Sequence, residues 1–397
     1  MKKATTVTIL NRHYPPSAAI TGKEAYKLSQ SIISESRAKL TVVHVRAPYK
    51  GVRAESNTRD ARLTIRTLPS LTTRSGTAAR LLGSLFESLL LALTSIRSDV
   101  VVCMTDPPFM FLFISILRRV RRFKLVYWAM DLYPETFAAA GLLNSKALLF
   151  RLYSYLVKTA PIDMLIALGP EQEQYLLSSH RKVKESLIWP CGIPTRNLGM
   201  VEHQQPNPTP QWYSSEHLHI VYAGNLGFAH DDSLLYAVAE AIDPNKHRLI
   251  LALYGEKSKE AHRRLQSMSG VVLVPFISPW EMDFTDLHLA SLLPEWTHVC
   301  VPSKAVTSIC SAKPILFCGS TAADAASFIG IKEMVVDPAL SVAEKSSRVE
   351  SILARLEQEK SPYQNNLVQV ASRLHAYELS AMKRITNYIK NLCEVKK

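Results

Sequence analysis

A lysine and a serine stand together at the start of an expected helix in the second half of the chain. An apolar stretch at 287–292 leads into a polar loop that ends in Pro302-Ser303-Lys304, and a short helix follows. A cation, a hydroxyl and the free amides of a helix start can together bind a diphosphate. The alternative is an ordinary strand–helix–strand unit with a solvated lysine.

Two glycine-containing loops follow expected strands and could bring a phosphate close to backbone amides. After the first strand, RHYPPSAAITGK places Gly22 at a helix start, where Thr21 as the N-cap is the simpler interpretation. The second half opens with HIVYAGNLGFAHD, in which Gly224 ends a strand. Asn225 and His230 then follow as groups able to hold phosphate oxygens. His230 could equally cap its own helix.

The elements that position these residues alternate between strands and helices. Apolar, β-branched runs separated by helical periods predict parallel sheets covered on both faces. Strands are expected at 6–10, 40–45, 63–67, 100–104, 124–128, 164–168, 219–223, 248–254, 271–274, 287–292, 314–317 and 334–336. Helices are expected at 24–34, 77–96, 109–121, 146–158, 171–178, 233–241, 256–268, 303–311, 322–329, and from 340 to the C-terminus.

A break in the alternation divides the chain. Residues 197–216, NLGMVEHQQPNPTPQWYSSE, are rich in proline and polar residues and predict a surface linker. We therefore expect one domain at 1–196, a second at 217–374, and a C-terminal helix at 375–397 that packs back on the first domain. The predicted fold class is α/β, with two Rossmann-like doubly wound domains facing a central cleft. Ligands of such sheets bind at the carboxyl ends of the strands.

The composition of the chain and the absence of certain sequence motifs argue against several classes of protein. Neither half has GxGxxG after its first strand, which disfavours a dinucleotide dehydrogenase, and no GxxxxGK[ST] P-loop is present. The six cysteines are scattered without CxxC spacing, as expected for reduced thiols in the cytoplasm. The N-terminus is too short and polar for a signal peptide, and no run has the length of a membrane span. Nucleic-acid binding would rest on charge alone.

Positive charge is concentrated in the first half of the chain. The net charge is +13, and residues 1–200 hold 28 Lys and Arg against 13 Asp and Glu. The apolar stretch 109–117 is followed by basic residues at 118–124, a pattern that suits an anionic membrane surface. Arg74, Arg80 and the leucine-rich helix that follows are a second candidate surface. The alternative for 109–124 is a core helix that ends in a solvated basic turn.

Several of these segments together resemble a known family, the GT-B-fold retaining glycosyltransferases of family 4, in particular the bacterial branch that builds capsule, O-antigen and exopolysaccharide. The matching segments span nearly the whole chain. They are YPP through Thr21-Gly22, TDPP at 105–108, WAMDLYPE at 128–135, the loop from Tyr222 to His230, VPSK at 301–304 and KPIL at 313–316. The resemblance implies transfer of a sugar, with retention, from a nucleotide-diphosphate sugar to a glycan acceptor, often linked to a polyprenyl diphosphate.

The resemblance also implies roles for single residues. Gly22 and Gly224 would border the donor diphosphate, and Asn225 and His230 take the places of a phosphate-pairing Arg and Lys. The donor loop would contain Ser303 and Lys304, and the nucleobase would be framed by Phe276 and Ile277. Asp131 would contact the acceptor hydroxyl. We expect no obligatory metal and no cofactor, because no Asp-x-Asp dyad follows a strand.

The chain departs from the family at the donor sugar. Two glutamates are usual there, but those places hold Val299 and Thr307. Glu295 is the nearest acid upstream and is our candidate substitute. The departure keeps two further interpretations open, a catalytically impaired scaffold protein of the same fold and, with less support, a nucleotide-sugar 2-epimerase. We expect a cytoplasmic protein that binds peripherally to the inner face of the membrane.

Overall fold

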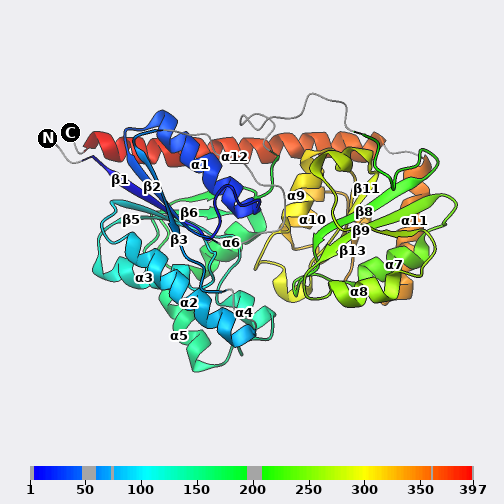
Figure 1. Cartoon of the computed structure of the whole chain (residues 1–397), viewed down its shortest axis with the longest axis horizontal. Helices are drawn as coiled ribbons and strands as arrows, with labels where there is room; N and C mark the ends of the chain where they lie inside the picture. Colours follow the sequence, from blue (N-terminus) through cyan, green and yellow to red (C-terminus); the bar gives the residue numbers. More distant parts are fainter. Residues whose placement is uncertain (1–3, 47–59, 73–75, 195–207, 359–360, 396–397) are drawn as a thin grey trace. The chain divides into compact units, whose positions relative to one another are not determined.

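The computed structural model describes residues 4–46, 60–72, 76–194, 208–358 and 361–395. The described residues fall into two compact units, one within residues 1–192 and 376–397 and the other within residues 193–375. Each unit is built on its own parallel sheet (Figure 1). Arg74 and most of the predicted linker, up to residue 207, lie outside the described residues.

Unit 1 contains a seven-stranded sheet with the order β3-β2-β1-β4-β5-β6-β7. All neighbouring strands pair in parallel. The strands are β1 (Thr6–Leu10), β2 (Lys39–Val45), β3 (Leu63–Leu68), β4 (Val100–Cys103), β5 (Lys124–Trp128), β6 (Met164–Ala167) and β7 (Ser186–Ile188). The short β7 was not predicted.

Helices cover both faces of this sheet. They are α1 (Ile20–Glu35), α2 (Thr77–Thr94), α3 (Met110–Val120), α4 (Glu135–Ala139), α5 (Leu148–Lys158) and α6 (Pro170–Ser179). Helix α3 packs between α2 and α5 on one face, whereas α1 lies on the other (Figure 1). Because β4 and β6 are buried at every position, the sheet forms the centre of the core.

Unit 2 repeats this plan with six parallel strands in the order β10-β9-β8-β11-β12-β13. The strands are β8 (Leu218–Asn225), β9 (His247–Tyr254), β10 (Val271–Leu273), β11 (Leu287–Ser291), β12 (Ile315–Cys318) and β13 (Val335–Val336). The helices are α7 (Ser233–Ala241), α8 (Ser258–Leu265), α9 (Ser303–Cys310), α10 (Asp324–Ile329) and α11 (Val342–Gln358), with 3₁₀ turns at Pro279–Phe284, Pro294–Trp296 and Lys332–Met334.

The last helix, α12 (Ser361–Val395), is longer than the predicted C-terminal helix. From Ala376 onward it belongs to unit 1. There Glu378 accepts a hydrogen bond from Lys27 of α1 at 2.7 Å, and Thr386 and Ser31 hydrogen-bond at 2.9 Å. The C-terminal part of α12 thus packs against α1.

The strand order reverses once in each sheet, between β1 and β4 in unit 1 and between β8 and β11 in unit 2. At such a point the loops leave in opposite directions and open a crevice at the carboxyl ends of the strands. The fold therefore indicates one candidate ligand position in each unit.

Candidate functional site

The switch point of unit 2 brings together residues from β8 and α9. Gly224, near the end of β8, has a φ of +121°, which favours glycine. A Cβ atom at this position would lie 3.0 Å from Cε of Lys304. Glycine therefore allows the lysine to lie across the end of the strand.

Lys304 is held in place by contacts with the end of the same strand. Its Nζ donates a hydrogen bond to the carbonyl of Asn225 at 2.8 Å and lies 3.9 Å from the centre of the Tyr222 ring. The Tyr222 hydroxyl donates to the same carbonyl at 3.0 Å. In the described part of the chain, no carboxylate forms an ion pair with Lys304. Desolvation lowers the pKa of Lys304 to about 7. A bound anion would stabilise the charged form of this lysine.

Helix α9 adds backbone amides to the cation. Ser303 is its first residue, and no side chain caps its N-terminus. The first turn contains no acidic residue that would compete with an anion. Ser303 and Lys304 thus lie where the sequence placed them, at the start of a helix beside the end of a strand.

The amide side chain of Asn225 is packed between two glycines. A Cβ on Gly255, whose φ is +107°, would lie 2.1 Å from Oδ1 of Asn225, and a Cβ on Gly227 would lie 3.0 Å from Nδ2. Both glycines thus make room for this amide. Asn225 itself remains exposed at the end of β8.

His230 is a neutral group rather than a cation. Its Nδ1 lies 2.8 Å from the Ser291 carbonyl, so Nδ1 carries the proton and Nε2 is an acceptor. Desolvation, with the nearby positive charges of Lys304 and Lys257, lowers the pKa of His230 to about 4. A neutral imidazole suits a hydroxyl donor better than a phosphate oxygen.

A second cation, which was not predicted from the sequence as a site residue, lies beside this loop. Lys257 donates a hydrogen bond to the His230 carbonyl at 2.6 Å and lies 3.4 Å from Asp232. It belongs to the loop after β9, where GEKSKE follows the strand. Lys257 could have been predicted from the sequence, because it follows a strand expected to lie in the same sheet as the strand that ends at Gly224.

The remaining predicted donor residues lie in different surroundings. Glu295 is exposed in the 3₁₀ turn after β11, close to where Leu293 donates a hydrogen bond to the Ala229 carbonyl at 2.8 Å. Phe276 is half exposed, but the Ile277 side chain is buried in the core with Val221 and Ile250. Hence only the backbone of Ile277 could frame a nucleobase.

Unit 1 gathers three polar side chains at its own switch point. Nε2 of His13, after β1, lies 3.3 Å from Oδ2 of Asp106, after β4. The amide of Asp131, after β5, donates to Oγ1 of Thr105 at 3.1 Å. Desolvation and, to a smaller extent, the Asp106 carboxylate raise the pKa of Asp131 to about 6. Asp131 was predicted from the sequence, whereas His13 and Asp106 were not.

Gly22 supports this group of residues through packing. Helix α1 begins at Ile20 with Ala19 as its N-cap, so Thr21 is not the cap and Gly22 lies within the first turn. A Cβ on Gly22 would lie 3.1 Å from the His13 carbonyl carbon and the Tyr14 nitrogen. The glycine thus allows the loop that carries His13 to pack closely on the helix.

Among the described residues, no group of three or more His, Cys, Asp or Glu side chains is arranged to hold a metal ion. At the two positions where the resembled family was expected to have glutamates, Val299 is buried, and Thr307 lies within α9.

Solved structures of other proteins share the fold of this chain. No sequence model of a protein family matches the chain, and no curated protein matches it. Solved structures do. WaaG, a glycosyltransferase involved in lipopolysaccharide biosynthesis, aligns with a TM-score of 0.60 over 96% of this chain and 99% of WaaG, at 14% identity. HepE of Anabaena, in complex with UDP and glucose, aligns with a TM-score of 0.62 over 96% of this chain and 100% of HepE, at 14% identity.

Sucrose-phosphate synthase of Thermosynechococcus elongatus aligns with a TM-score of 0.67 over 97% of this chain and 99% of that enzyme, at 11% identity. The chain has the GT-B glycosyltransferase fold. Both GT-B units are covered by these alignments, which confirms the predicted fold class of two parallel α/β domains.

Proposed function

We propose that this GT-B protein is a glycosyltransferase that transfers a sugar, with retention, from a nucleotide-diphosphate sugar to a lipid-linked glycan acceptor in surface polysaccharide biosynthesis. The observation that carries the proposal is the convergence of Gly224, Asn225 and Lys304 at the start of α9. Lys304 has no carboxylate partner among the described residues and lies next to uncapped amides, so this position is chemically suited to a diphosphate.

Two structural neighbours support the proposed donor and pathway. HepE was crystallised with UDP-glucose, and WaaG takes part in lipopolysaccharide biosynthesis. A UDP-sugar is therefore the first donor to test. The family 4 assignment rests on the sequence segments quoted above.

In the proposed reaction, the bond between C1 of the sugar and the diphosphate oxygen breaks while the acceptor oxygen bonds to C1 from the same face. Lys304 and the amides of α9 stabilise the negative charge that develops on the leaving diphosphate. The acceptor hydroxyl passes its proton to the leaving diphosphate oxygen on the same face as the new bond forms. Asp131 is the proposed group that orients this hydroxyl, because it follows a neighbouring strand at the switch point of unit 1. No step in this scheme requires a metal or cofactor.

The substitution of Val299 and Thr307 for glutamates favours one second candidate, a protein of this fold that binds a nucleotide sugar without transferring it. Glu295 is the proposed substitute for these acids in the active enzyme. Incubation with UDP-sugars and a lipid-linked acceptor, followed by mass spectrometry of the lipid product, separates the two functions. Glycosylated lipid supports transfer. Nucleotide binding without any product would favour the scaffold function.

A further inference from the structure

Three neighbouring helices of unit 1 expose large apolar side chains to solvent. On α2, Leu82, Phe86 and Leu93 are exposed at spacings of four and seven residues. Such spacings place the three side chains on one side of the helix. This side faces away from the core, where a soluble helix normally carries polar residues.

Helices α3 and α5 extend this surface. Val120, in the last turn of α3, is 75% exposed, and Leu148, at the start of α5, is 80% exposed. Leu149 and Leu152 are exposed beside Leu148 on α5. Because α3 packs against both α2 and α5 on one side of the sheet (Figure 1), we group the exposed side chains of the three helices as one surface of unit 1. We call it the α2–α3–α5 face.

The charges on this face have one sign. Its three helices contain a single carboxylate, that of Glu87, which is buried and paired with Arg12 at 3.0 Å. Exposed cations are present instead, among them Arg80 on α2, Arg119 on α3 and Arg151 on α5. A protein partner with a mixed surface would find no acidic group here to pair with its own cations.

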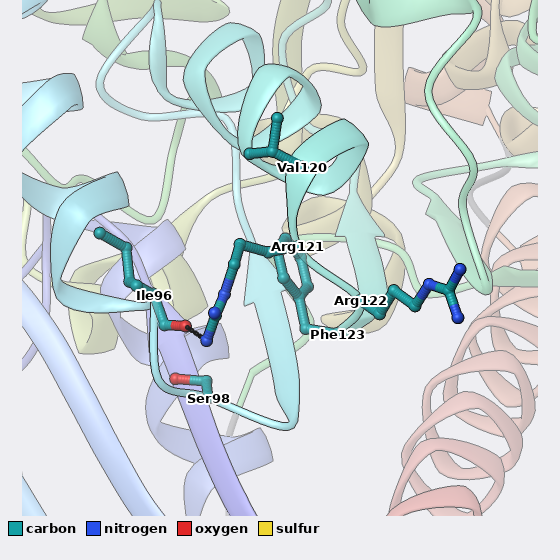
Figure 2. A pocket seen from close by; sticks show the side chains of 6 residues that line it. All are labelled: Ile96, Ser98, Val120, Arg121, Arg122 and Phe123. Carbon is teal, nitrogen blue, oxygen red and sulfur yellow. Dashed lines mark hydrogen bonds between the residues drawn. The ribbon is translucent and has the colours of Figure 1, made fainter.

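A small pocket at the end of α3 adds two further arginines. It has a volume of about 270 Å³ and lies among Ile96, Ser98, Val120, Arg121, Arg122 and Phe123. Figure 2 shows Arg121 extending toward the Ile96 carbonyl, to which it donates a hydrogen bond at 3.1 Å, while Arg122 extends the other way. One hydrogen bond leaves most of the Arg121 N–H groups for an anion.

We infer that the α2–α3–α5 face docks on an anionic lipid bilayer. The exposed leucines and Phe86 enter the interface between headgroups and acyl chains, and the surrounding arginines pair with lipid phosphates. The contact is peripheral, since no helix in the described ranges is long and apolar enough to cross a membrane. The inference goes beyond the proposed function, because binding to lipid requires neither a donor nor a transfer reaction.

The structure corrects the linear segment expected from the sequence. Much of 109–117 faces the core, because Met110, Phe111 and Ile114 are buried. Of the basic residues that follow, Arg118 pairs with the buried Asp163 at 3.4 Å. The exposed apolar surface is formed by three helices instead. The apolar side chains of α5 were not predicted from the sequence to belong to a membrane-binding surface.

The test is co-sedimentation of the full chain with vesicles of phosphatidylcholine alone and of phosphatidylcholine mixed with phosphatidylglycerol. We expect binding to the mixed vesicles that falls with added salt, since salt screens exposed charges. Leu148→Ser/Leu149→Ser should weaken it at least about tenfold, because each leucine loses its apolar burial. The matched control is Val368→Ser/Leu379→Ser, which alters exposed apolar residues on α12 and should bind like the unmodified chain.

A charge variant tests the other half of the inference. Arg121→Ser/Arg122→Ser should lower the affinity for the mixed vesicles about fivefold for each arginine removed. The control Lys383→Ser/Lys390→Ser, on α12, should lower this affinity by less than about fivefold in total. Equal binding to both vesicle types, or no effect of the leucine pair, would overturn the inference. It would also be overturned if light scattering showed a dimer that the leucine pair dissociates, with no vesicle binding, since the face would then hold a second copy.

Discussion

The ammonium group of Lys304 donates a hydrogen bond to the carbonyl of Asn225 at 2.8 Å, although the two residues are 79 positions apart in the sequence. The contact joins the first turn of α9 to the last residue of β8. It places a positive charge at the switch point of the unit 2 sheet, beside the uncapped amides of the helix. The candidate donor site is built around this contact.

Gly224→Ala should disturb the site through the lysine. The new Cβ would lie 3.0 Å from Cε of Lys304, and the φ of +121° would be strained. We expect a loss of about 1–3 kcal/mol in the free energy of unfolding, together with loss of nucleotide binding. Gly76→Ala is the matched control, because its φ is +104° and no atom lies within 4 Å of the added Cβ. If both variants bind nucleotide equally well, Gly224 has no role beyond its backbone conformation.

Nucleotide binding should depend on pH through Lys304. Its pKa of about 7 lies below the usual value of 10.5 because of desolvation. A diphosphate prefers the ammonium form, so affinity should fall as pH rises above about 7, and binding there should take up a proton. Calorimetry in buffers of different ionisation enthalpy measures this uptake. If nucleotide binding to Lys304→Met still takes up a proton, the proton binds to a group other than Lys304.

The same pKa makes a prediction for stability without ligand. Between about pH 7 and 10.5 the unfolded lysine binds more protons than the folded one, so the Lys304 contribution should raise the free energy of unfolding as pH increases. Urea unfolding of the unmodified chain and of Lys304→Met across this range isolates that contribution. An identical pH dependence in the two proteins would contradict the assignment.

Asp131→Asn should lower kcat and leave nucleotide affinity unchanged, because Asp131 belongs to unit 1 and the donor residues belong to unit 2. The pKa of about 6 predicts a transfer rate that rises as pH increases through 6 and the carboxylate forms. Asp106→Asn removes a charge that raises this pKa, so the rise of the transfer rate with pH should occur at lower pH in this variant. If the transfer rate of Asp106→Asn rises at the same pH as that of the unmodified chain, a group other than Asp131 controls the pH dependence.

A buried group of charges should stabilise unit 1. Lys27 contacts Glu24 at 3.3 Å and Glu378 at 2.7 Å, and Glu24 also accepts hydrogen bonds from Trp189 and from the amide of Gly192. Lys27→Met leaves two buried carboxylates without their cation, which should cost about 3–5 kcal/mol of unfolding free energy. Lys383→Met, at an exposed position of α12, is the control. Equal thermal midpoints would show that the buried charges reorganise without cost.

Much of the fold follows from local pattern. All twelve expected strands are present within a few residues, because buried parallel strands are nearly continuous apolar runs. Strand β7 was missed because it has only three residues, Ser186–Ile188. Helix α1 begins before the predicted residue 24, since Ala19 takes the N-cap place without a capping side chain.

The candidate site is only partly readable from the sequence. Ser303 and Lys304 are adjacent, and their helix start has a local signature. The pair of His13 and Asp106 has no such signature, because only the order of the strands brings the ends of β1 and β4 together. The burial of Ile277 and the tautomer of His230 likewise depend on packing partners that are distant in sequence.

The most direct test of the central claim is calorimetric titration with nucleotide diphosphates. Among UDP, GDP and ADP, we expect one to bind, and Lys304→Met should weaken its binding about 10- to 100-fold, as for a lost charge-assisted hydrogen bond. Lys332→Met, an exposed lysine of unit 2, should bind with unchanged affinity. If no nucleotide binds, or if Lys304→Met binds as tightly as the unmodified chain, the proposed donor site is contradicted.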